Sequence, residues 1–243
     1  MGKGLGDSIR SEYLDAMGIS QWNLREGAED EPGHLEVTDN PREQGLETVD
    51  WAALQAQVSA CTRCDLHKTR TQTVFGVGDQ QADVLIIGEA PGADEDQQGE
   101  PFVGRAGQLL NEMLLAAGYQ RSDVYIANVL KCRPPGNRNP RPEEMGCCQG
   151  WLRQQIEWIK PKLIIAVGGI AAHNLLQTEE AVGRLRGVTH CYGKQRIPLV
   201  VTYHPAYLLR SPLEKRKVWA DLQFAQQLIN SVAEDQATVS VLD

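Results

Sequence analysis

The 243-residue chain lacks the features that mark several large classes of protein. No apolar run approaches the ~20 residues of a membrane span, and the first residues lack the charged-then-apolar pattern of a secretory signal. There is no internal repeat, and neither a Walker-type nor a GxGxxG phosphate loop. Only 6% of the residues are aromatic, three of them phenylalanine. We therefore expect neither a membrane protein nor a secreted one, and place the chain in the cytoplasm.

The net negative charge is confined to the first 50 residues of the chain. Residues 1–50 carry 12 Asp and Glu against 4 Lys and Arg, which accounts for the whole net charge of -8, whereas residues 51–243 carry 20 of each. A neutral body of this kind can still present a basic face to nucleic acid, although an ordinary solvated surface explains the charges equally well. The basic residues of two stretches are Arg133, Arg138, Arg141, Arg210, Lys215, Arg216 and Lys217.

The composition divides the chain into four parts. Residues 1–25 contain a few large apolar side chains, too few to fold alone, which favours a docking peptide. Residues 26–50 are rich in Glu, Asp, Pro and Gly and predict an acidic disordered linker. Residues 51–232 hold enough apolar residues for one medium domain. Residues 233–243 form a C-terminal tail, and we expect a monomer.

The body reads as an α/β domain. Short apolar runs alternate with helical patterns, which predicts a three-layer α/β/α fold with a central parallel four-stranded sheet. Asp50 is placed to cap the first helix. The predicted strands are residues 83–88, 124–129, 163–168 and 198–203. The main predicted helices are residues 104–117, 142–159, 170–176 and 213–229.

A polar, Gly- or Pro-containing loop follows each predicted strand. Open parallel sheets bind ligands beyond the carboxyl ends of their strands. We therefore expect the chemistry of the chain to converge on one edge of the sheet.

The cysteines are spaced like metal ligands. Cys61 and Cys64 form a CxxC, Cys132 lies far downstream, and Cys147 or Cys148 supplies a fourth thiol. In a reducing compartment such thiols are better read as ligands than as disulfides. One site joining distant segments in this way suits zinc or an iron–sulfur cluster.

Three sequence blocks, in order, resemble the motifs of family 4 uracil-DNA glycosylases. Residues 88–104 begin Gly-Glu-Ala-Pro-Gly, residues 128–138 contain Lys-Cys-Arg-Pro-Pro, and residues 204–210 read His-Pro-Ala-Tyr-Leu-Leu-Arg. The resemblance covers about residues 54–228. It implies a uracil-DNA glycosylase-like fold and an enzyme that flips uracil out of DNA and hydrolyses its N-glycosidic bond, which initiates base excision repair. No lysine stands at the matched catalytic positions, so lyase activity is not expected.

The resemblance also implies a uracil pocket. Phe102 would stack on the base, Ala90 would line the pocket, and the carboxamide of Asn128 would pair with uracil O4 and N3–H. His204 would stabilise negative charge on uracil O2 as the base departs. A water must attack the oxocarbenium-like sugar that remains. Glu89 is the first candidate to position that water.

Further site residues follow from the same blocks. Glu95 is the second candidate for water activation. A loop containing Pro205, Tyr207 and Leu208 would enter the duplex as an apolar wedge, and Arg210 would contact phosphate. Four cysteines would hold a structural [4Fe–4S] cluster, with zinc as the chemical alternative. The implied ligands are Cys61, Cys64, Cys132 and Cys148.

The leading segment carries a different resemblance. Residues 10–25 are similar to the N-terminal peptide of the psi subunit of the bacterial DNA polymerase III clamp loader, which implies a tether to replication. Two other readings stay open at this stage. One is a catalytically silent accessory protein that only binds DNA, and the other is a glycosylase for another deaminated base.

Overall fold

The computed structural model describes residues 50–239. The predicted docking peptide, all of the predicted linker except Asp50, and the last four residues lie outside the described residues. No helix within the described range is long and apolar enough to cross a membrane.

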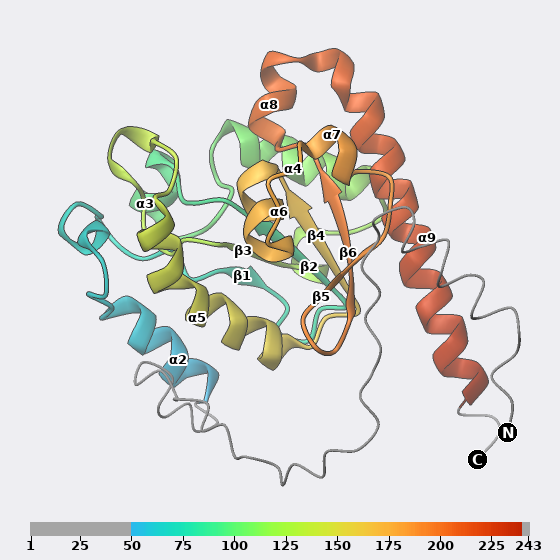
Figure 1. Ribbon diagram of the computed structural model, residues 1–243, viewed down its shortest axis with the longest axis horizontal. Helices are drawn as coiled ribbons and strands as arrows, with labels where there is room; N and C mark the ends of the chain where they lie inside the picture. Colours follow the sequence, from blue (N-terminus) through green and yellow to red (C-terminus); the bar gives the residue numbers. More distant parts are fainter. Residues whose placement is uncertain (1–49, 240–243) are drawn as a thin grey trace, which may run out of the picture. The chain divides into compact units, whose positions relative to one another are not determined.

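A six-stranded sheet, ordered β1-β3-β2-β4-β6-β5, forms the centre of the described body (Figure 1). Its four central strands pair in parallel, which confirms the predicted α/β class and parallel core. These strands are β2 (Val84–Gly88), β3 (Tyr125–Asn128), β4 (Leu163–Val167) and β6 (Ile197–Thr202).

The prediction of four strands is incomplete because two short strands extend the sheet at its edges. β1 (Val77–Gly78) pairs antiparallel with β3, and β5 (His190–Tyr192) pairs antiparallel with β6. They contain two and three residues and are only partly buried. Segments this short carry no recognisable alternation of apolar and polar residues, so the sequence does not predict them as strands.

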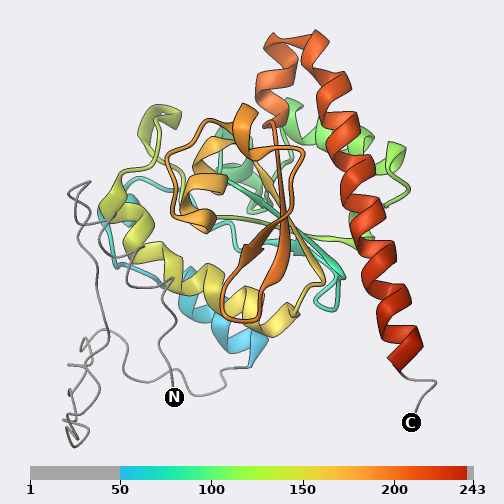
Figure 2. The same ribbon diagram turned by 45° about the vertical axis from the view of Figure 1, so that its right-hand side comes forward.

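Helices cover both faces of the sheet, as Figures 1 and 2 show. The helices α2, α5 and α6 pack on one face, and α4, α8 and α9 on the other. The bounds are α2 (Trp51–Ser59), α3 (Ala93–Gln98), α4 (Arg105–Ala116), α5 (Pro142–Ile159), α6 (Gly169–Leu176), α7 (Val182–Leu185), α8 (Pro205–Arg210) and α9 (Lys215–Val239).

The strands are apolar on both sides because each side faces a helical layer. In β2, Leu85 and Ile87 belong to the core beneath α2 and α5, whereas Val84 and Ile86 belong to the core beneath α4 and α9. Successive side chains of a strand point to opposite faces, so one continuous apolar run supplies both cores.

Some local details differ from the predictions. Asp50 stands at the N-cap of α2, but its side chain makes no capping hydrogen bond, and buried Trp51 packs the start of the helix against Phe75 instead. The last helix continues to Val239, beyond its predicted end at residue 229. The helices α3, α7 and α8 were not predicted, since each has only four to six residues.

Candidate active site and cysteine site

An open pocket lies beyond the carboxyl ends of β2, β3 and β6, at the edge expected for an open parallel sheet. It brings together all six side chains predicted to bind or act on the base, although they come from three distant segments of the chain. Tyr207 and Arg210 line the same pocket. The six residues are Glu89, Ala90, Glu95, Phe102, Asn128 and His204.

Asn128 occupies the last position of β3 and is only 2% exposed. Its Oδ1 atom is buried and has no hydrogen-bond partner. Buried polar groups are nearly always paired, because an unpaired acceptor costs about 1–3 kcal/mol. An orphaned amide oxygen lining a pocket therefore indicates a binding group whose partner is a ligand.

Gly88, in register with Asn128 on the neighbouring strand, allows the pocket to form. A Cβ atom at Gly88 would lie 2.4 Å from Asn128 Oδ1 and 2.6 Å from Phe102 Cζ. Both distances are shorter than van der Waals contact. Only glycine at this position lets the amide and the aromatic ring stand so close together.

Phe102 is held in an unfavourable backbone conformation. Its φ angle is 54°, in the left-handed region that costs a non-glycine residue roughly 1–2 kcal/mol. The loop is fixed on both sides of the ring. Arg121 donates to the carbonyl of Pro101 at 2.5 Å, and Glu95 accepts from the next two amides. Such strain persists where the surroundings dictate the conformation, commonly at functional sites.

The carboxylate of Glu95 is occupied by hydrogen bonds from backbone amides. Its carboxylate accepts from the amides of Gly92, Val103 and Gly104 at 3.0–3.1 Å. These hydrogen bonds cap the start of α3 and link it to the loop that carries Phe102. Glu89, by contrast, is a half-buried carboxyl group of the pocket, and burial raises its pKa above the usual glutamate value.

The tautomer and the orientation of the His204 imidazole ring are fixed by its contacts. Its Nδ1 accepts from the amide of Ala206 at 3.1 Å, so the proton of a neutral ring lies on Nε2. Burial, followed by the nearby Arg210 charge, lowers the pKa of His204 to about 4. The ring stacks on Phe102 with centroids 5.6 Å apart and planes inclined by 29°. His204 is therefore a neutral imidazole that donates through Nε2.

The segment after His204 differs from the predicted apolar wedge. It forms α8, in which Leu208 is 0% exposed and packs in the core beside α4 and α9, and Pro205 is also buried. Neither side chain is available to enter a duplex. The helical repeat instead turns Tyr207 and Leu209 outward, at 36% and 39% exposure. The prediction that Pro205 and Leu208 enter the duplex is therefore wrong. The same role for Tyr207 stays a prediction.

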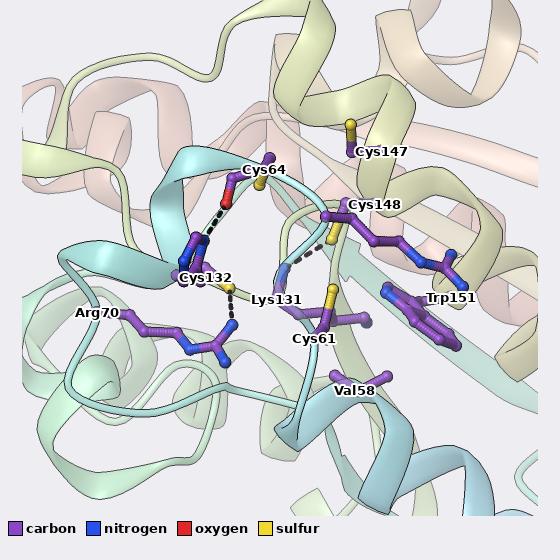
Figure 3. Close-up of a pocket in the computed structure, with 11 residues that line it drawn as sticks. Val58, Cys61, Cys64, Arg70, Lys131, Cys132, Cys147, Cys148 and Trp151 are labelled. Carbon is purple, nitrogen blue, oxygen red and sulfur yellow. Dashed lines mark hydrogen bonds between the residues drawn. The ribbon is translucent and has the colours of Figure 1, made fainter.

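The cysteines gather around a second, smaller pocket (Figure 3). Cys61 and Cys64 follow α2, Cys132 follows β3, and Cys148 lies in α5. In Figure 3 the sulfur of Cys147 points away from the space that these four side chains surround. Cys147 also lines the pocket, whereas Figure 3 draws the sulfur of Cys148 facing the other three thiols.

Hydrogen-bond donors point at two of these sulfurs. Arg70 donates to Cys132 Sγ at 3.0 Å, and the amide of Lys131 donates to Cys148 Sγ at 3.3 Å. Burial raises the pKa of the Cys132 thiol, which Arg70 partly offsets, and raises that of Cys148 to about 12. Thiols so deeply buried become thiolates only with strong positive partners such as a metal centre.

The thiols are not arranged around a single ion. Among residues 50–239, no three His, Cys, Asp or Glu side chains form a group that could hold one metal ion. Zn–S bonds of about 2.3 Å would require sulfurs only about 3.8 Å apart. Four cysteine thiols are a donor set that both zinc and iron–sulfur clusters use.

Sequence comparison agrees with this geometry. The profile of the uracil DNA glycosylase superfamily matches residues 75–223. The type-4 uracil-DNA glycosylase of Archaeoglobus fulgidus is 45% identical over 174 residues, which cover 69% of this chain and 87% of the relative. This chain belongs to the type-4 uracil-DNA glycosylase family.

Two further relatives give the same assignment. The type-4 uracil-DNA glycosylase of Pyrobaculum aerophilum is 44% identical over 182 residues, covering 72% of this chain and 92% of its own length. That of Thermotoga maritima is 43% identical over 178 residues, covering 71% and 91%. The shared region is thus most of the glycosylase domain of each protein.

The buried hydrogen-bond networks of Lys131 and Asp221 were not predicted from sequence. Lys131 is 1% exposed, and its Nζ donates to the carbonyl of Asn128 and to Gln155 Oε1. Asp221 of α9 accepts from Thr202 at the end of β6 and from Arg186. A polar residue inside an otherwise apolar helical face, such as Gln155 or Asp221, is the sequence signal that could have found them.

Proposed function

We propose that this chain is a monofunctional uracil-DNA glycosylase, which hydrolyses the N-glycosidic bond of deoxyuridine in DNA and so initiates base excision repair. The observation that carries the proposal is the buried, unpartnered Oδ1 of Asn128. Uracil N3–H is a donor that can satisfy it, and the amide nitrogen can donate to O4. Cytosine presents an acceptor and a donor in the opposite places, so the same amide discriminates against it.

The other pocket residues complete the recognition of a flipped base. Phe102 places an apolar ring next to the side-chain amide of Asn128. The loop that carries the ring is fixed by Arg121, which donates to the carbonyl of Pro101. Flipping costs a few kcal/mol of unstacking, which stacking in the pocket helps to offset. Ala90, a small residue of the pocket wall, leaves space for the base.

His204 is proposed to stabilise the departing base. As the glycosidic bond breaks, negative charge develops on uracil O2, and the Nε2–H of a fixed neutral imidazole donates to it. The Nδ1 contact with Ala206 sets this tautomer in advance, and stacking on Phe102 fixes the plane of the ring. The histidine can thus act without changing its protonation state.

Glu89 is proposed to position the attacking water. The sugar becomes oxocarbenium-like, so a nearby carboxylate both orients water and stabilises positive charge. Glu89 has its carboxyl group in the pocket, whereas that of Glu95 already accepts three backbone amides. We therefore assign Glu95 to holding the Phe102 loop rather than to the water.

We further propose that Cys61, Cys64, Cys132 and Cys148 hold a [4Fe–4S] cluster. Four buried or half-buried thiols, with donors aimed at two sulfurs, are a ligand set that such a centre uses, and zinc is the chemical alternative. The cluster would supply a rigid link between α2, β3 and α5, and no step of base excision requires electron transfer. Measured iron and sulfide, against zinc, would test the assignment.

The exposed residues around the pocket are proposed to contact the DNA. Tyr207 is partly exposed at its edge and lies 5.1 Å from the ring of Tyr203, which provides an aromatic surface for the gap left by the flipped base. Arg210 also lines the pocket and can bind phosphate, whereas Arg138 is paired with Glu144. We propose that the enzyme works as a monomer in the cytoplasm, where thiols stay reduced.

The leading segment supports a separate proposal, which depends on sequence alone. Residues 10–25 are similar to the psi-subunit peptide, so we propose that they bind the clamp loader and raise the enzyme's concentration near new DNA. A pull-down of clamp loader should fail with Trp22→Ala and succeed with Trp219→Ala, a control in the glycosylase domain. Equal capture by both variants would refute the tether.

Cleavage of a labelled oligonucleotide with one deoxyuridine, after alkali treatment, tests the glycosylase proposal. His204→Ala should abolish cleavage, while His173→Ala should not, because His173 lies outside the pocket and bonds the carbonyl of Glu180. Full activity of His204→Ala would remove its proposed role. Absence of cleavage by the loaded parent protein would favour a silent DNA-binding accessory or a different damaged base.

A further inference from the structure

A single buried lysine lies between the candidate uracil pocket and the cysteine site. Lys131 is 1% exposed, one of the most deeply buried long side chains of the described body. Its Nζ donates to the carbonyl of Asn128 at 3.0 Å and to Gln155 Oε1 at 2.5 Å. Gln155 is fully buried and is itself fixed by donating to the carbonyl of Phe75 at 3.0 Å.

The charge of this lysine has no carboxylate to balance it. None of the ion pairs within residues 50–239 includes Lys131, and both acceptors of its ammonium group are neutral oxygens. An isolated buried ammonium group is strongly unfavourable unless an opposite charge is near. A negative charge close to Lys131 would offset this cost.

The cysteine site adjoins the backbone of Lys131. The amide of Lys131 donates to Cys148 Sγ at 3.3 Å, and the next residue in the chain is Cys132. In Figure 3 a dashed line joins the backbone nitrogen of Lys131 to the sulfur of Cys148. When the thiols are ligands they are thiolates, and four of them give a [4Fe–4S] centre a net negative charge. That charge would compensate the ammonium group.

The opposite end of Lys131 reaches the residue that reads the base. Its acceptor is the backbone carbonyl of Asn128, whose side chain carries the unpartnered Oδ1. The segment between them is anchored to the first pocket loop, because Val129 and Leu130 donate to the carbonyls of Gly88 and Glu89. The ammonium group therefore helps fix where β3 ends and where the amide of Asn128 stands.

We propose that Lys131 is a positioning residue that couples the cluster to uracil recognition, its charge being balanced by the cysteine thiolates while its ammonium group holds Asn128 in place. The inference rests on the proposed cluster and on the proposed role of Asn128. It assigns the cluster a part in substrate recognition beyond its link between chain segments.

The test compares the loaded parent protein with Lys131→Met, which keeps the apolar stem but cannot donate or carry charge. Iron and sulfide content establish loading. Excision of uracil from a duplex should fall about tenfold or more in kcat/KM. Affinity for a duplex with an abasic site, which has no base for Asn128 to read, should be unchanged. Lys162→Met removes a surface pair with Asp83 and should change neither quantity.

Cluster removal by oxidative chelation provides a readout independent of activity. The parent should lose more Tm on cluster removal than Lys131→Met, by about 4 °C or more, because only the parent keeps an unbalanced buried charge. Should Lys131→Met not fold, Gln155→Glu serves instead. It places a carboxylate beside Lys131 and should likewise reduce the loss of Tm.

The outcomes separate this inference from the proposals beneath it. Equal losses of Tm on cluster removal, or parent-like kcat/KM in loaded Lys131→Met, would overturn the coupling. Parent protein that binds iron but releases no uracil would refute the proposed activity, and the Tm comparison would still decide whether Lys131 depends on the cluster. Parent protein without iron would overturn both the cluster and the coupling.

Discussion

Asn128 and Gln155 are two buried carboxamides for which the structure predicts opposite effects of the same substitution. Asn128 is 2% exposed with an unpaired Oδ1, whereas Gln155 is 0% exposed and bonded at both ends. Leucine has a similar size and no polar atom. Asn128→Leu removes an unsatisfied acceptor, and Gln155→Leu removes the partner of Lys131 and of a buried carbonyl.

The magnitudes follow from the cost of unpaired groups. Asn128→Leu should stabilise the DNA-free protein by about 1 kcal/mol, whereas Gln155→Leu should destabilise it by about 2–4 kcal/mol. For a domain of this size each kcal/mol corresponds to roughly 2–4 °C in Tm. Asn128→Leu also loses two hydrogen bonds to uracil, worth about 2–3 kcal/mol together, so kcat/KM should fall on the order of 10²-fold.

Thermal unfolding of the iron-loaded protein, followed by steady-state excision assays, measures both effects. The decisive result is that Asn128→Leu is more stable but less active than the parent protein, whereas Gln155→Leu is less stable than the parent protein. A loss of stability in Asn128→Leu would refute the reasoning, because it would show that Oδ1 already has a partner in the free protein.

Two further predictions concern the same pocket. Because burial raises the pKa of Glu89, kcat/KM should fall as the pH drops through a value above the usual glutamate range. Glu89→Gln should be less active and should lack this fall at acid pH. His204, with a pKa of about 4, stays neutral throughout this range. A parent-like profile for Glu89→Gln would exclude that carboxylate. Gly88→Ala should lower kcat/KM at least about tenfold and destabilise by about 1–3 kcal/mol, since its Cβ would clash with the pocket. Gly146→Ala, whose Cβ meets nothing within 4 Å, is the control, and equal effects of both would contradict the packing argument.

The parallel core could be predicted because its strands are continuous apolar runs between turns. Each strand faces a helical layer on both sides, so every residue of the strand is buried and the sequence shows a continuous apolar run. The edge strands β1 and β5 could not be found, since two or three half-exposed residues carry no such pattern. The prediction for Leu208 failed because α8 is a short helix whose buried face cannot be read from six residues.

The pocket residues were predicted together because the family resemblance implies them, and the position of their segments after strands places them at one edge of the sheet. Lys131 shows what that reasoning misses. A lysine in such a loop gives no sign of burial, and its partner Gln155 comes from a helix that follows later in the chain. Likewise the sequence makes Glu95 a candidate for water activation and gives no sign that its carboxylate accepts from three backbone amides.

Direct identification of the released base is the most decisive measurement. Iron-loaded protein is incubated with two duplexes that differ only in carrying one deoxyuridine or one deoxycytidine, and the free base is identified by mass spectrometry. The account predicts uracil from the first duplex and no cytosine from the second, with the uracil signal lost in Asn128→Leu to the extent calculated above. Release of neither base by fully loaded protein, or equal uracil release by Asn128→Leu, would contradict it.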